Sequence, residues 1–67
     1  MEHFFLGEVY QVTRPNGVVI SFKFLGDRDN VNDATEIISS NTDKLPTGTI
    51  ISIDVLLAVP YIQISRV

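Results

Sequence analysis

The sequence predicts a small α+β domain with the element order β-β-α-β-β, in which two antiparallel hairpins form a sheet and one short helix packs on it. Two stretches rich in β-branched and aromatic residues, 4–26 and 48–67, predict the hairpins. Between them a helix-start pattern predicts the helix. With 67 residues the chain is expected to be one domain. Because a domain this small buries only about 60% of the surface of its unfolded chain, its apolar residues must be used efficiently.

The first hairpin turns at the Pro-Asn-Gly sequence of residues 15–17. A two-residue Asn-Gly turn would mix polar and apolar side chains on both faces of the sheet. A three-residue loop, with the glycine as the left-handed residue of a bulge, separates them instead. This register places Val12 opposite Ile20 and Tyr10 opposite Phe22. The apolar face then consists of Phe4, Leu6, Tyr10, Val12, Val18, Ile20, Phe22 and Phe24.

Glu8 is the exception in this register, because it falls on the apolar face. A buried carboxylate without a partner costs several kcal/mol or becomes neutral. Gly7 precedes it and suits a bulge. We therefore expect a bulge that turns Glu8 outward and brings Phe5 to the apolar face in place of Phe4 or Leu6.

The middle of the chain contains the tetrad Asp-Ala-Thr-Glu at 33–36, which has the form of a capping box. It predicts a short helix that ends near Asn41, since Leu45 and Pro46 prevent its continuation. A short strand over 36–40 is the alternative. It would make the domain a small five-stranded barrel of the OB or SH3 kind.

The last third of the chain alternates in hydrophobicity, as a second hairpin would. A four-residue connection over 57–60 would place Val55 opposite Ile62 and Ile53 opposite Ile64. This connection contains a proline but no Gly, Asn or Asp, so it is an unusual turn or a bend at a sheet edge.

The acid-rich segment 26–37 does not have the spacing of a calcium-binding loop. Counted from Asp27, positions 5, 6 and 12 hold Val, Asn and Ile, where such a loop needs an oxygen ligand, Gly and Glu. A looser site of Asp27, Asp29 and Asp33 competes with a solvated loop that leads into a capped helix, which explains the same residues. The sequence thus predicts no metal site and no cofactor.

Catalytic groups are scarce in this sequence. His3 is the single histidine, cysteine is absent, and no serine has a base at a recognisable spacing. The net charge is −3, and the five Lys and Arg residues are scattered, which argues against general nucleic-acid binding. No apolar run approaches the ~20 residues of a membrane span, and no secretory signal is visible. These features predict a cytoplasmic protein that is not an enzyme and does not bind membranes.

Apolar residues on both faces of the predicted strands exceed what one short helix can cover. A contiguous exposed patch marks a partner interface, although a tight barrel would use the same residues. We therefore predict a non-enzymatic protein-interaction module, an accessory factor or inhibitor. Its partner would be another protein or a second copy of the chain, as in a homodimer. Binding would use strand edges, whose unpaired backbone groups a second copy could extend, together with the side chains of Leu56, Leu57, Val59, Pro60 and Tyr61.

Phe22, Lys23 and Phe24 support a different hypothesis. Two aromatic residues spaced two apart on a strand faintly resemble the strand on which RNA-binding sheets stack bases. The alternative function is thus a small barrel-like module that binds single-stranded nucleic acid or a small ligand on this aromatic face. Core packing accounts for the same residues.

Overall fold

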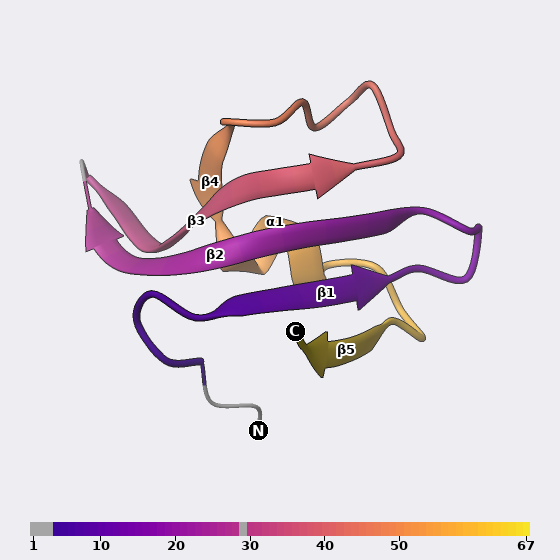
Figure 1. Cartoon of the computed structure of the whole chain (residues 1–67), viewed down its shortest axis with the longest axis horizontal. Coiled ribbons are helices and arrows are strands. Elements are labelled where there is room, and N and C mark those ends of the chain that lie inside the picture. Colours follow the sequence, from indigo (N-terminus) through magenta and orange to yellow (C-terminus); the bar gives the residue numbers. More distant parts are fainter. Residues whose placement is uncertain (1–3, 29) are drawn as a thin grey trace.

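The computed structural model describes residues 4–28 and 30–67, which form one five-stranded antiparallel sheet and one short helix (Figure 1). The strand order is β4-β3-β2-β1-β5. The predicted combination of antiparallel strands with one short helix is therefore confirmed, but the helix lies elsewhere in the chain. The elements are β1 (Val9–Thr13), β2 (Val19–Arg28), β3 (Val31–Ser40), β4 (Ile50–Ser52), α1 (Ile53–Leu57) and β5 (Gln63–Arg66).

The first hairpin, β1 and β2, has the predicted register. Val12 pairs with Ile20 and Tyr10 with Phe22. Gly17 has φ 90° and its N–H donates to the carbonyl of Arg14 at 3.0 Å, which closes the predicted three-residue loop. The register follows from the turn chemistry because only this loop length places the apolar side chains on one face.

The segment before β1 confirms the outward position of Glu8, which follows the left-handed Gly7 (φ 81°). The Glu8 side chain is 44% exposed. The expected exchange of phenylalanines is wrong: Phe5 is exposed, and the Phe4 ring packs edge-on against Tyr10 at 4.9 Å. Leu6, expected in the core, is also exposed. The cause is a turn in which the Glu8 N–H donates to the Phe5 carbonyl, so strand alternation stops before β1.

Residues 31–40 form β3 and not the predicted helix, so the alternative of a strand is correct and the strand is longer than 36–40. Asp33 is no helix cap, because it lies in β3 with φ 51° and its N–H donates to Asp27 Oδ1 at 3.1 Å. β3 pairs with β2 on one side and β4 on the other, and this pairing outweighs the local helix-start signal. The buried residues of β3 are Ala34, Thr35 and Ile37.

The last third of the chain is not a hairpin. β4 pairs with β3 and β5 pairs with β1, so the predicted Val55–Ile62 and Ile53–Ile64 pairs are wrong. α1 connects the two strands. Its N-cap is Ser52, the last residue of β4, whose hydroxyl accepts a hydrogen bond from the Asp54 N–H at 3.3 Å. Within residues 4–28 and 30–67, no helix is long and apolar enough to cross a membrane.

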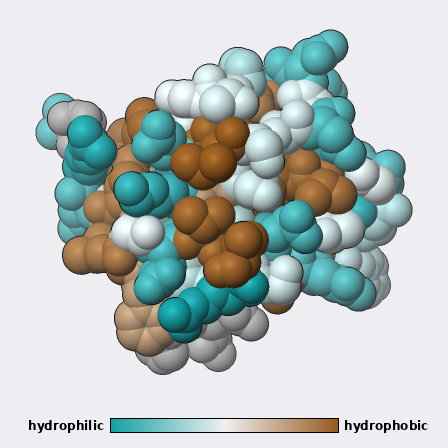
Figure 2. Space-filling view, viewed as in Figure 1, coloured by the Kyte–Doolittle hydropathy of each residue, from teal (hydrophilic) through white to brown (hydrophobic). Residues whose placement is uncertain are grey.

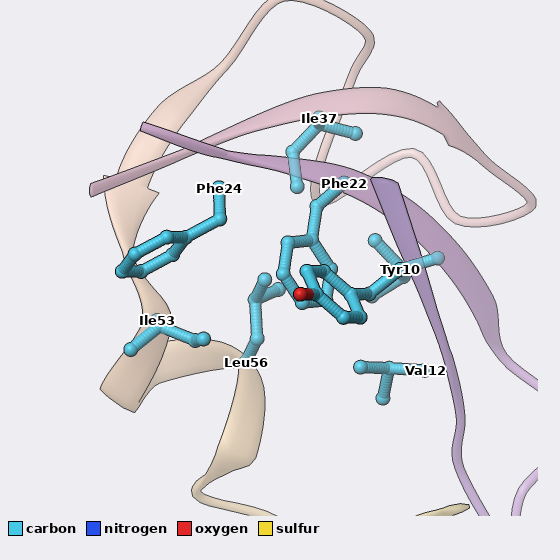
Figure 3. Packing of buried hydrophobic residues seen from close by; sticks show 8 residues of the cluster. Tyr10, Val12, Phe22, Phe24, Ile37, Ile53 and Leu56 are labelled. Atoms are coloured by element: carbon cyan, nitrogen blue, oxygen red, sulfur yellow. The ribbon is translucent and has the colours of Figure 1, made fainter. Parts of the chain in front are cut away.

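The core lies between the inner face of the curved sheet and α1 (Figure 3). β2 and β3 have ten residues each, and bulges in their pairing let both strands bend around this core. The buried hydroxyl of Thr35 donates to the Ile51 carbonyl at 3.0 Å, which satisfies the polar group and ties β4 to β3. The core cluster consists of Tyr10, Val12, Ile20, Phe22, Phe24, Ile37, Ile53 and Leu56.

Candidate interaction site

The predicted interface divides into buried and exposed residues. Leu56 is fully buried between α1 and the sheet, so it offers no surface to a partner and belongs to the core instead. Its spacing of three residues from Ile53 places both side chains on the inner face of α1. Leu57 and Val59 are half-buried, whereas Pro60 and Tyr61 are exposed. The predicted interface is thereby reduced to the connection between α1 and β5.

The alternative site at Phe22, Lys23 and Phe24 is not assembled. Phe22 is fully buried and Phe24 nearly so, with their rings among the other core side chains (Figure 3). Base stacking requires an exposed ring face, which neither residue offers. Lys23 points to the other face of the sheet, where its neighbours across the strands are Val9 and Glu36.

The face of the sheet away from α1 carries the second set of apolar residues that the sequence indicated. Figure 2 shows that hydrophobic areas on this face are separated by polar ones. Val9, Val19 and Leu25 are half-buried there, and Ile38 is 41% exposed. Scattered apolar side chains of this kind are normal for a protein surface, so this face supplies no distinct site.

Tyr61 is the most unusual residue of the exposed connection. Its side chain and backbone together are 90% exposed, yet its φ is 62°, in the left-handed region that side chains other than glycine rarely occupy. Such a conformation costs about 1–2 kcal/mol. Because the side chain buries almost no surface, it contributes too little stability to offset this cost. The stability of the fold therefore does not explain a tyrosine at this position. Strain of this kind clusters at functional sites.

Replacing Tyr61 with glycine is expected to leave the free energy of unfolding unchanged or to raise it by up to about 1 kcal/mol. Glycine relieves the strain of the left-handed backbone in the folded state, but it also makes the unfolded chain more flexible, which offsets part of this gain. Urea unfolding monitored by circular dichroism measures the difference. A loss of more than about 1 kcal/mol would show that the Tyr61 side chain stabilises the fold, contrary to its exposure.

β5 follows Tyr61 and is an edge strand that pairs only with β1 among the described elements (Figure 1). The Val67 N–H donates to the Val9 carbonyl at 3.0 Å. In an antiparallel pair, alternate residues direct both backbone groups to the partner, so residues 63, 65 and 67 face β1. The backbone N–H and C=O groups of Ile64 and Arg66 therefore point to the open side, where no residue of 4–28 or 30–67 pairs with them.

A small cluster of side chains lies beside this open edge. Arg66 Nη2 is 3.6 Å from Glu8 Oε1, and the guanidinium carbon lies 6.0 Å from the centre of the Phe5 ring. Both charged groups are about half exposed, so the ion pair adds at most about 1 kcal/mol to stability. Its main effect is to neutralise the Glu8 carboxylate beside the edge.

Residues 26–28 of the acid-rich segment lie in β2, and residues 31–37 lie in β3. Asp29 of the looser metal site lies outside the described residues, as does His3. In the described part of the chain, no three His, Cys, Asp or Glu side chains lie together in a way that could hold a metal ion. Asp27 instead bonds to the Asp33 backbone.

The sequence predicted binding through strand edges but did not identify the open edge, and no residue of β5 was among the predicted site residues. The alternation of residues 61–65 indicates a strand, but only the pairing with β1 shows which backbone groups remain open. Comparison of the chain with protein-family models, curated proteins and solved structures finds no match. Its function is therefore argued from its own surface.

Proposed function

We propose that this chain is a non-enzymatic module that binds another polypeptide, as an accessory factor or inhibitor, by adding an extended segment to the open edge of β5. The exposed Tyr61, held in a left-handed conformation at the start of this edge, is the observation that carries the proposal. The outward N–H and C=O groups of Ile64 and Arg66 supply the complementary chemistry, since they match the main chain of any extended peptide.

The two parts of the site have different roles. Main-chain hydrogen bonds to β5 supply affinity that does not depend on the sequence of the partner. Tyr61 supplies specificity, because an exposed aromatic side chain presents a large contact area with few rotatable bonds and tyrosine is enriched among the residues that dominate binding energy. Pro60 precedes it and restricts the backbone of the connection.

A phage-displayed random peptide library selected on the immobilised chain tests this proposal. We expect peptides with alternating apolar residues, and we expect Tyr61→Ser to weaken their binding at least about tenfold, as the loss of an interface anchor does. Ile38→Ser is the matched control, because Ile38 is also exposed but lies on β3, three strands from β5.

Binding is measured by fluorescence anisotropy of a labelled selected peptide. Equal affinity for the wild type and Tyr61→Ser, or an equal loss in Ile38→Ser, would count against the proposed site. Circular dichroism of each variant establishes that it is folded.

A further inference from the structure

We propose that the polypeptide at the β5 edge is a second copy of the same chain, whose β5 pairs antiparallel with the first around a twofold axis at Ile64. This inference rests on the proposed function, because it assigns the partner of the same edge. Three features carry it: the difference between the two edges of the sheet, the distribution of charge and the symmetry of the pairing.

The two edges of the sheet differ in how they are protected. β4 has only three residues and leads directly into α1, and the chain before it is held against β3 by bonds of Gly48 and Thr49 to Ile37. β5 has four residues, pairs with β1 in an unbroken register and contains neither proline nor a bulge. Proteins usually protect an edge strand from pairing with another chain by a proline, a bulge or a charged side chain. Of these protective features β5 has only the charge of Arg66, and that charge is paired with Glu8.

The charge distribution permits a second copy to approach this edge although each chain carries −3. Glu8 lies beside β5, where Arg66 pairs with it. β3 lies three strand spacings from β5, or about 14 Å, which exceeds the Debye length of about 8 Å at physiological salt. The other described acids are Asp27 on β2, Asp33 and Glu36 on β3, Asp43 in the β3–β4 connection and Asp54 in α1.

The sequence of β5 selects the register of this pairing. A twofold axis at Arg66 would place two guanidinium groups opposite each other, which is unfavourable. An axis at Ile64 instead pairs Ile64 with the partner's Ile64, so that their outward N–H and C=O groups exchange two hydrogen bonds. In this register the partner's Val67, 77% exposed, approaches the turn before β5, where Tyr61 is 90% exposed. The two most exposed apolar side chains along this edge are thereby brought near each other.

Sedimentation equilibrium of the full chain tests the association. We expect the mass to rise with concentration from 7.5 kDa to twice this value. Arg66→Pro removes an outward N–H without removing a hydrogen bond to β1, and it should raise the dissociation constant about tenfold or more, because both copies lose a hydrogen bond. Arg66→Ala is the matched control: it keeps the N–H and should change the constant less than about threefold, the usual size of an exposed ion-pair effect.

Disulfide cross-linking tests the register, since the natural chain contains no cysteine. With the axis at Ile64, residue 63 of one copy lies opposite residue 65 of the other as a non-hydrogen-bonded pair, with Cα atoms about 4.5 Å apart, within disulfide range. A mixture of Gln63→Cys and Ser65→Cys chains should therefore cross-link to each other upon oxidation. Efficient cross-linking of Ser65→Cys to itself would place the axis at Ser65 and overturn this register.

A concentration of about 1 mM corresponds to the dissociation constants of the weakest specific complexes. A wild-type chain that remains a monomer at this concentration would overturn the inference of a second copy. Equal effects of Arg66→Pro and Arg66→Ala on the dissociation constant would do so as well. If such a monomer still binds library peptides in a Tyr61-dependent way, the proposed function stands and only its partner changes. If it binds no peptide either, both proposals fail.

Discussion

Replacing Phe22 with alanine is expected to remove much or all of the stability of the fold. Phe22 is fully buried at the centre of the core, where its ring lies 5.8 Å from Tyr10 and 6.0 Å from Phe4. Removing a buried phenylalanine costs about 3–5 kcal/mol. A chain of 67 residues has a free energy of unfolding of about 3–10 kcal/mol at the usual 0.05–0.15 kcal/mol per residue, so this one loss consumes much or all of the stability.

Thermal and urea unfolding of the Phe22→Ala variant measure this loss, with circular dichroism as the signal. Phe5→Ala is the matched control, because Phe5 is 59% exposed and contacts the Arg66 side chain rather than the core. Its free energy of unfolding should fall by less than about 1 kcal/mol. A Phe22→Ala variant that loses less than about 1 kcal/mol would contradict the position of the core.

Leu56→Ala is the second large effect that we expect. Leu56 is fully buried on the inner face of α1, so its truncation should lower the free energy of unfolding by about 2–5 kcal/mol. The same substitution would cost little if Leu56 belonged to an exposed interface, as the sequence predicted. Urea unfolding therefore distinguishes a core residue from an interface residue directly.

The control for this prediction lies one residue earlier in the same helix. Val55 is 53% exposed, so Val55→Ala should change the free energy of unfolding by less than about 1 kcal/mol, helped by the higher helix propensity of alanine. Similar losses in the two variants would contradict the orientation of α1 against the sheet.

The corrected site changes how the interaction function is understood. The sequence predicted binding through strand edges together with the continuous apolar segment from Leu56 to Tyr61. In the structure the residues of that segment differ in burial: Leu56 lies in the core, whereas Tyr61 lies on the surface. The remaining site combines one exposed aromatic residue with the open backbone of β5, so its affinity would come from main-chain hydrogen bonds as well as from side chains.

The sequence by itself determined the first hairpin. The Pro-Asn-Gly loop and the alternation on either side of it were sufficient to predict the Val12–Ile20 and Tyr10–Phe22 pairs. The outward position of Glu8 also followed, from the cost of burying a charge. These features are local, because a short loop joins the two strands and sets their register without reference to the rest of the chain.

Only the tertiary structure decided the rest. The segment from Asp33 to Glu36 satisfies the rules for a helix start, but β2 and β4 pair with it on both sides and make it a strand. The alternation of residues 50–56 suits a strand, yet the chain must pass from one edge of the sheet to the other, and α1 makes this crossing while burying Ile53 and Leu56. Which strands become neighbours depends on residues distant in sequence, so local patterns did not reveal that β5 joins β1 and leaves one edge open.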